Sequence, residues 1–205
     1  MSSSPSAVSC CARFITDPWA AAKVLVPSVA IEVVLHNKVW QKCSLRHLTL
    51  YLALINTYWF ASTINLSFLE SPLIMHIPTM DEKQKTECGR YRFNWLNKFE
   101  IMLGVLSLDL FCVWRERILD NNGFVDRCLY QAVLVPALIT GAQAAYLLPK
   151  LNERAQLVSK GAATTDDLYK DKVFPKAHRA YIGFETAKVV GLAVAGLRFG
   201  RMLTI

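Results

Sequence analysis

Apolar residues are gathered in four long runs, and polar or charged stretches separate these runs from one another. The runs cover residues 48–69, 97–114, 128–149 and 178–200. A helix needs about 20 mostly apolar residues to cross the hydrocarbon core of a bilayer. The pattern therefore predicts an all-α, polytopic membrane protein in which residues 48–205 form a bundle of four transmembrane helices.

An N-terminal extension, residues 1–47, precedes these runs and contains a fifth, shorter apolar stretch. That stretch, residues 19–35, is near the lower length limit for a span and is interrupted by Lys23, Pro27 and Glu32. We interpret it as a helix that lies at the interface or packs on the bundle, with a further crossing as the alternative. The Ser-rich start of the chain is expected to be disordered.

Three connections join the four predicted spans. They cover residues 73–96, 115–127 and 150–176. Pro72 is expected to end the first helix, because proline disrupts a helix interior. The second half of the first connection is expected to lie at the membrane interface. Asn122-Gly123 predicts a turn in the second connection, and Gly161 predicts a turn that leads into a short helix in the third.

Polar or small residues form stripes at helical spacing on three of the predicted helices. The stripes comprise Asn56, Thr63, Ser67 and Glu70 on the first helix, Asn97, Glu100, Gly104 and Ser107 on the second, and His178, Tyr181, Glu185 and Lys188 on the fourth. The first helix also carries Tyr51, Tyr58 and Trp59. Tyrosine and tryptophan are common near membrane–water interfaces, where we expect these side chains.

Counting the spans brings polar groups to one end of the bundle. If the first helix crosses from side A to side B, the second and fourth helices start on side B and the third ends there. We expect one cluster in the side B half, comprising Glu70, Asn97, Glu100, Arg154, His178, Tyr181, Glu185 and Lys188. Ionisable groups at membrane depth usually face the protein interior or a wet cavity. The sequence leaves two interpretations open: ion pairs that hold the bundle together, or a cavity for a ligand.

Small residues recur every four positions on the third and fourth predicted helices. They are Ala137, Gly141 and Ala145 on the third, and Ala187, Gly191 and Ala195 on the fourth. Small residues at this spacing let membrane helices approach closely. We expect these two helices to pack tightly against each other.

Composition and charge agree with a membrane location. Only 19% of the 205 residues are charged, against about 25% in a typical soluble domain. The formal net charge is +7, and basic loops are attracted to anionic membrane surfaces, so we expect lipid rather than nucleic acid as the partner. Side B has more Lys and Arg than side A, which weakly favours the inside for side B.

The motifs of several site classes are missing from the sequence. The six cysteines include no CxxC pair, which disfavours a structural zinc site. The paired Glu-x-x-His spacing of a di-iron bundle is absent, and so are phosphate-binding loops and the HExxH pattern. We therefore expect no catalytic residues, no metal and no cofactor.

Four short motifs resemble an uncharacterised family of small four-helix integral membrane proteins, best represented in bacteria. The motifs are SFLESP (67–72), LNKFE (96–100), KLNERA (150–155) and HRAYIGFETAK (178–188). The resemblance covers about residues 48–205 and implies a four-helix fold with a polar cluster, but no known activity. The chain departs from the family at Asn152, where an Asp is expected, and residues 1–47 have no counterpart.

These observations predict a multi-pass membrane protein with a non-enzymatic structural or accessory role. One alternative is a small transporter or permeation protein that uses the polar cluster. Another is a membrane enzyme or metal-binding protein. The expected partners are the lipid bilayer and a second membrane protein or further copies of this chain.

Overall fold

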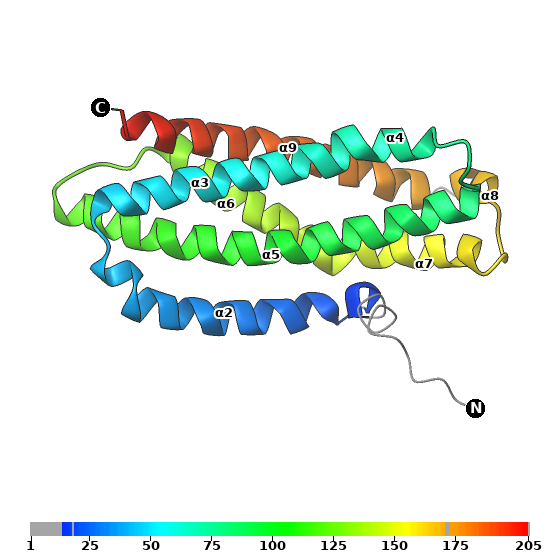
Figure 1. The fold of residues 1–205 in the computed structure, drawn as a ribbon, viewed down its shortest axis with the longest axis horizontal. Coiled ribbons are helices and arrows are strands. Elements are labelled where there is room, and N and C mark those ends of the chain that lie inside the picture. Colours follow the sequence, from blue (N-terminus) through cyan, green and yellow to red (C-terminus); the bar gives the residue numbers. More distant parts are fainter. Residues whose placement is uncertain (1–13, 18, 171–172, 205) are drawn as a thin grey trace.

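The computed structural model describes residues 14–17, 19–170 and 173–204, which form helices joined by short connections. The long helices lie side by side along one axis, so the molecule is an elongated bundle (Figure 1). Their bounds are α2 (Ala20–Lys38), α3 (Leu45–Thr63), α4 (Ser71–Met75), α5 (Glu82–Asp120), α6 (Arg127–Ala142), α7 (Leu148–Ser159), α8 (Thr165–Lys170) and α9 (Val173–Met202). The expected disordered start of the chain falls almost entirely outside the described residues.

Three short turns complete the order of elements. A 3-10 turn, η1 (Trp40–Lys42), follows α2. The π-helical turn η2 (Ile64–Glu70) joins α3 to α4, and η3 (Gln143–Leu147) joins α6 to α7. The chain therefore runs as a helix without a break from α3 through α4, and again from α6 through α7.

Four helices form a closed ring, in which each contacts two neighbours. α3 packs on α9, α9 on α6, α6 on α5, and α5 on α3. α2 lies outside this ring along α5 (Figure 1). α4, α7, α8 and the start of α5 build one end of the bundle, which we call the side B end (Figure 1).

The helices are longer than the sequence predicted, and several expected boundaries are wrong. Pro72 does not end the first helix, because it is the second residue of α4, where a missing N–H is tolerated. The Ser71 hydroxyl donates to the Leu66 carbonyl at 2.7 Å. Pro149 likewise stands early in α7, behind η3. In both places a π-helical turn comes directly before the proline-containing helix. The helix therefore continues beyond the four-helix ring, toward the side B end.

Most of the connection expected at residues 73–96 is helical. Asp81 caps α5 through a capping box with Gln84, so the helix starts fifteen residues before Asn97, at Glu82. α5 has 39 residues and is about 58 Å long at 1.5 Å per residue. The hydrocarbon core is only about 30 Å thick. The second half of the expected connection is therefore the start of a helix that is longer than the hydrocarbon core is thick.

The other two connections are also shorter than predicted, but their turns are confirmed. α5 continues to Asp120, where Asn122 has a φ of 57° and the Gly123 N–H donates to the Ile118 carbonyl at 2.8 Å. α7 continues to Ser159, and Gly161 then has a φ of 71° before the short helix α8. Positive φ values favour glycine and asparagine, which explains why these turns are readable from sequence.

Three helical stretches are long and apolar enough to cross a membrane, by length and composition. They are Ala20–Lys42, Arg127–Ser159 and Val173–Met202. α5 is not among them, because the window at 97–114 contains Lys98, Glu100 and Asp109. α3 is also not among them, since polar and aromatic residues lower its hydropathy. The fold is compatible with a multi-pass membrane protein on these grounds.

Candidate functional site

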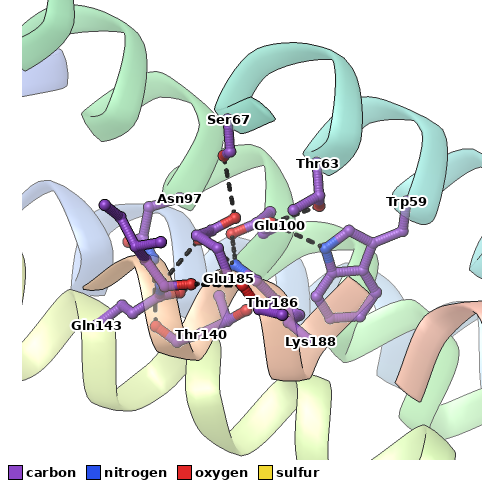
Figure 2. Close-up of polar contacts among 11 residues, drawn as sticks. Trp59, Thr63, Ser67, Asn97, Glu100, Thr140, Gln143, Glu185, Thr186 and Lys188 are labelled. Atoms are coloured by element: carbon purple, nitrogen blue, oxygen red, sulfur yellow. Dashed lines mark hydrogen bonds and ion pairs between the residues drawn. The ribbon is translucent and has the colours of Figure 1, made fainter. Parts of the chain in front are cut away.

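The centre of the site is the ammonium group of Lys188, which has no solvent exposure. Its Nζ donates to Glu100 Oε2 at 2.5 Å, to Glu185 Oε1 at 2.8 Å and to Gln143 Oε1 at 2.9 Å. A lysine has three N–H donors, so each of them has a partner. The three acceptors come from α5, α9 and η3, which the ammonium group therefore holds together (Figure 2).

Glu100 connects this ammonium group to α3. Its Oε1 accepts from Trp59 Nε1 at 3.1 Å and from Thr63 Oγ1 at 2.8 Å. Gly104, one turn further along α5, leaves room for the indole, since a Cβ there would lie 3.3 Å from the Trp59 ring. The Glu100 carboxylate thus accepts three hydrogen bonds while it is completely buried.

Glu185 completes the arrangement from the other side. Its Oε1 accepts from Gln143 Nε2 at 2.8 Å as well as from Lys188, and its Oε2 accepts from Ser67 Oγ at 3.0 Å. Side chains from α3, η2, α5, η3 and α9 therefore meet in one hydrogen-bonded group (Figure 2). We call it the buried network, comprising Trp59, Thr63, Ser67, Glu100, Gln143, Glu185 and Lys188.

The electrostatics of the buried network depend on its neutral donors. Two carboxyl groups face one ammonium group, so the ion pairs alone do not balance the formal charge. Indole, hydroxyl and amide donors add hydrogen bonds to the carboxylates, and such charge-assisted bonds are stronger than neutral ones. A buried pair is stable only when its remaining lone pairs and protons are satisfied. The network meets this requirement at both carboxyl groups.

Three buried polar atoms beside the network have no hydrogen-bond partner among the described residues. They are Asn97 Oδ1, Thr140 Oγ1 and the Tyr181 hydroxyl oxygen. Asn97 still ties α5 to α6, because its Nδ2 donates to the Thr140 carbonyl at 3.1 Å. Tyr181 lies near Glu185 on the same helix, and its ring packs edge-on against Phe93.

The structure brings only part of the expected cluster together. Glu100, Glu185 and Lys188 form its centre, with Asn97 and Tyr181 beside them. Glu70 is elsewhere: it is partly exposed and pairs with Arg92 and Asn65. It does not join the network because η2 carries it past the level of Glu185, where the bundle opens to the surface.

His178 and Arg154 are also outside the network. His178 lies two turns before Glu185 on α9 and stacks on Phe174, with ring centroids 5.9 Å apart. Arg154 lies on α7, about three turns beyond Gln143. Asn152, expected to replace a carboxylate of the cluster, instead exchanges two hydrogen bonds with Asn94, at 2.6 and 3.0 Å.

Two members of the network were not expected from the sequence. Trp59 was assigned to a membrane interface, but it has no exposed surface and donates to Glu100. Gln143 was not singled out, although it stands among apolar and small residues, twelve positions from Gln131, the other amide of its stretch. That isolation was the available signal, because a buried amide in an apolar run needs partners. Thr63 and Ser67 were recognised only as parts of a stripe.

The small residues lie at two helix contacts, and only some of them are those predicted. A Cβ on Gly191 would lie 3.0 Å from the Pro136 side chain, so α9 is tight against α6 there. A Cβ on Gly196 would lie 2.7 Å from the Thr57 hydroxyl, so α9 is equally close to α3. Gly141, Ala145 and Ala187 are exposed and Ala137 faces Gly104, so these four do not form the expected contact with Gly191.

A smaller polar contact joins α2 to α5 near side A. His36 Nδ1 lies 2.7 Å from Asp109 Oδ1, and Trp40 Nε1 donates to Glu32 Oε2 at 3.1 Å. These side chains explain why Glu32 is the buried charged residue of α2. They attach α2 to the ring, whereas most of its other side chains remain exposed.

A cavity of about 340 Å³ lies at the side B end of the bundle, and we call it the end cavity. α4, α5, α7 and α9 line it, together with Ser67 of η2 and Leu168 of α8. Ser67 also donates to Glu185, so the cavity reaches the edge of the buried network. Within the described ranges, no three His, Cys, Asp or Glu side chains come together as metal ligands.

Compared with known protein families, with curated proteins and with solved structures, the chain matches none of them.

Proposed function

We propose that the chain is a multi-pass integral membrane protein with a non-enzymatic structural or accessory role. In this proposal α5, α6 and α9, together with α3 and its extension through η2, form a bundle of four transmembrane helices. Large apolar side chains that are exposed on the outside of the ring support a lipid-facing surface. They include Leu54, Met102, Leu138, Val190 and Leu197.

The observation that carries the proposal is that the Lys188 ammonium group has a protein partner for each of its hydrogen-bond donors. All three of its donors bind protein groups, and its exposure is 0%. Such a group has no donor left for a substrate. Since lipid is as apolar as a leucine side chain, burial of apolar residues gives membrane helices little reason to choose one neighbour over another. A network with one satisfied geometry selects both the neighbours and their register.

The resemblance to the uncharacterised membrane family supports the same role. Three of its four motifs supply the network: SFLESP contains Ser67, LNKFE contains Glu100, and HRAYIGFETAK contains Glu185 and Lys188. Residues from three motifs that are far apart in sequence are thus partners in one set of hydrogen bonds. Membership in this family is part of the proposal.

We also propose that α2 crosses the bilayer as an additional helix rather than lying in the interface. It runs along α5 in the direction of the bundle axis (Figure 1), and Ala20–Lys42 is long and apolar enough to span. An interfacial helix would lie across the bundle axis instead of along it. In this arrangement the start of the chain is on side B.

The test uses Glu185→Gln in the full chain, expressed in membranes and purified in an uncharged detergent. Glutamine keeps the shape of the side chain but weakens the charged bond to Lys188, so the yield of folded protein falls. Glu153→Gln, at an exposed position of α7, is the matched control and leaves the yield unchanged. Equal yields for both variants would contradict the locking role. Extraction of the wild-type protein by alkaline carbonate would contradict the membrane location.

A transporter or permeation protein is the second candidate, because the end cavity reaches Ser67 and hence Glu185. A proton or small solute that enters the cavity meets the network at this hydroxyl. Reconstituted vesicles test this function: a pH-dependent flux that Ser67→Ala abolishes would favour it over the structural role, and no flux above empty vesicles would remove it.

A further inference from the structure

The end cavity lies where the bundle leaves the predicted membrane region. One end of it is at Ser67 and Ile182, near the ends of the predicted spans, and it extends along the first three turns of α5. Its volume of about 340 Å³ is at the lower end of the roughly 300–1,000 Å³ of small-molecule sites. It is therefore suited to a slender ligand rather than a bulky one.

The walls and the rim of the cavity are mostly apolar. The lining includes Phe93, Leu148, Leu151, Ala155, Leu168 and Phe174. Three lining residues are themselves exposed, Pro72 and Met75 on α4 and Ile182 on α9. The cavity therefore opens between α4 and α9, across an apolar rim that a hydrocarbon chain can pass.

The opposite wall, on α5, carries the charge. Lys85, Arg90 and Arg92 line the cavity, while no Asp or Glu is among the lining residues that the structure describes. The Arg90 side chain is only 8% exposed and binds Glu87 through Nε and Nη2, at 2.6 and 2.7 Å. Arg92 binds Glu70 through Nη2. A guanidinium has five N–H donors, so one carboxylate does not exhaust it.

We propose that the end cavity binds a single-chain amphiphile with an anionic headgroup, for which a long-chain fatty acid is the simplest chemistry. The chain lies on the apolar wall and the headgroup meets the cations of α5. A carboxylate or phosphate forms charge-assisted hydrogen bonds with such side chains. The site goes beyond the structural role proposed above and rests only on the membrane location, which brings the rim level with the edge of the bilayer.

Gly89 provides a way to close the cavity without disturbing the helix. It lines the cavity, and a Cβ built on it would have nothing within 4 Å. A larger side chain therefore occupies open space. Glycine is a poor residue for a helix interior, so replacing it also favours the folded state of α5.

The experiment uses purified full-length protein in an uncharged detergent and a long-chain fatty acid that carries a photoreactive diazirine. We expect labelling of the peptides that contain Phe93 and Ile182. Unlabelled palmitate competes, whereas the alcohol of the same chain length and acetate do not, since each lacks one half of the amphiphile. A lysophospholipid with an anionic headgroup is a second competitor and distinguishes phosphate from carboxylate as the preferred headgroup.

Two pairs of variants make the result specific. Gly89→Leu reduces labelling at least about tenfold and leaves the melting temperature equal or higher, whereas Gly89→Ala keeps the labelling. Lys85→Gln combined with Arg92→Gln also reduces it, whereas Lys83→Gln, outside the cavity, does not. Undiminished labelling of Gly89→Leu, or equal competition by the alcohol, would overturn the proposal. Because carbonate extraction tests the membrane location separately, the two proposals can fail independently.

Discussion

The two halves of the bundle are built from the same helices but are held together differently. In the side A half, a continuous apolar core contains Leu48, Leu52, Leu110, Phe111, Trp114, Leu129, Val133 and Phe199. Phe199 packs edge-on against Trp114, with ring centroids 5.3 Å apart. In the side B half, the ion pairs of Lys188 with Glu100 and Glu185 are as deeply buried as these rings.

The two halves differ in how strictly each one determines which helices pack together and in what register. Apolar side chains of similar volume can replace one another and repack, whereas a buried ammonium group accepts few arrangements of acceptors. The side A half therefore holds the helices together mainly through side chains that can repack, with the hydrogen bond from Trp114 Nε1 to Thr49 Oγ1, at 2.9 Å, as a directional contact between α5 and α3. We infer that the side B half fixes the register of the helices, because Lys188 joins α9 to α5 and η3 at single atoms.

The largest expected effect is that of Lys188→Met, which keeps the length of the side chain and removes its charge. Glu100 and Glu185 then remain buried without their common partner, and breaking such a buried pair costs about 3–5 kcal/mol. Denaturant unfolding in detergent micelles measures the loss. Lys176→Met, on the exposed surface of the same helix, is the control and changes stability by less than about 0.5 kcal/mol. A loss as small as that of the control would erase the distinction between the halves.

The next effect is expected at Gly191, one turn beyond Lys188, where the two halves meet. Gly191→Leu forces a large side chain into the contact with Pro136 and Ala132, and overpacking of this kind costs about 1–3 kcal/mol. Gly200→Ala is the control in open space, since a Cβ there meets nothing within 4 Å. It should raise stability slightly through helix propensity. Both are measured in the same micelles, and equal behaviour would show that α6 and α9 do not pack closely.

A smaller effect is expected in the side A core. Phe199→Leu keeps the position apolar but shrinks a buried side chain, and small large-to-small changes such as Ile→Val cost about 0.5–1.5 kcal/mol. Glu100→Gln changes the shape even less, yet it should cost more because Lys188 loses a charged acceptor. Comparing the unfolding midpoints of the two variants sharpens the contrast between the two halves. A larger loss of stability for Phe199→Leu than for Glu100→Gln would contradict it.

The smallest effect is expected at the surface of the side B end, where Glu87 accepts hydrogen bonds from Arg90 and Ser159. The Arg90 guanidinium lowers the pKa of Glu87 below the ordinary value of 4.5. A carboxyl group with a lowered folded-state pKa stabilises the protein above its unfolded-state pKa, and this stability is lost as the pH falls through the folded-state value.

Glu87→Gln should therefore lower the unfolding free energy at pH 7 by less than about 1 kcal/mol, because the pair is partly exposed. The melting temperature should fall slightly as a result. The difference from wild type should disappear in acid, below the folded-state pKa. A difference that persists unchanged in acid would show that Arg90 does not stabilise the ionised carboxylate.

The sequence predicted the helical class because its apolar runs are long and its turns carry specific residues. Asn122 and Gly161 stand where the backbone has positive φ, so these turns were readable locally. The ends of the helices were not. Pro72 looked like a terminator, but the η2 turn before it lets the helix continue, and a π-helical turn has no clear local pattern.

The site was predictable to the extent that it follows helical spacing. Glu185 and Lys188 are one turn apart, and counting the spans placed Glu100 at their level. Partners from other helices depend on rotation about each helix axis, which the sequence does not give. For this reason the sequence predicts Trp59 at the interface and Glu70 in the cluster, whereas Trp59 binds Glu100 and Glu70 turns toward Arg92. It likewise gives no rotation that would direct Gln143 toward Lys188.

The most direct test of the locking role is a double-mutant cycle between Glu100→Gln and Lys188→Met, with unfolding free energies measured in the same micelles. If the two side chains hold α5 to α9, the double variant loses less than the sum of the single variants. The coupling energy should then be at least about 1 kcal/mol, within the range of roughly 0.5–3 kcal/mol seen for residues in contact. Additivity within about 0.5 kcal/mol would contradict the account.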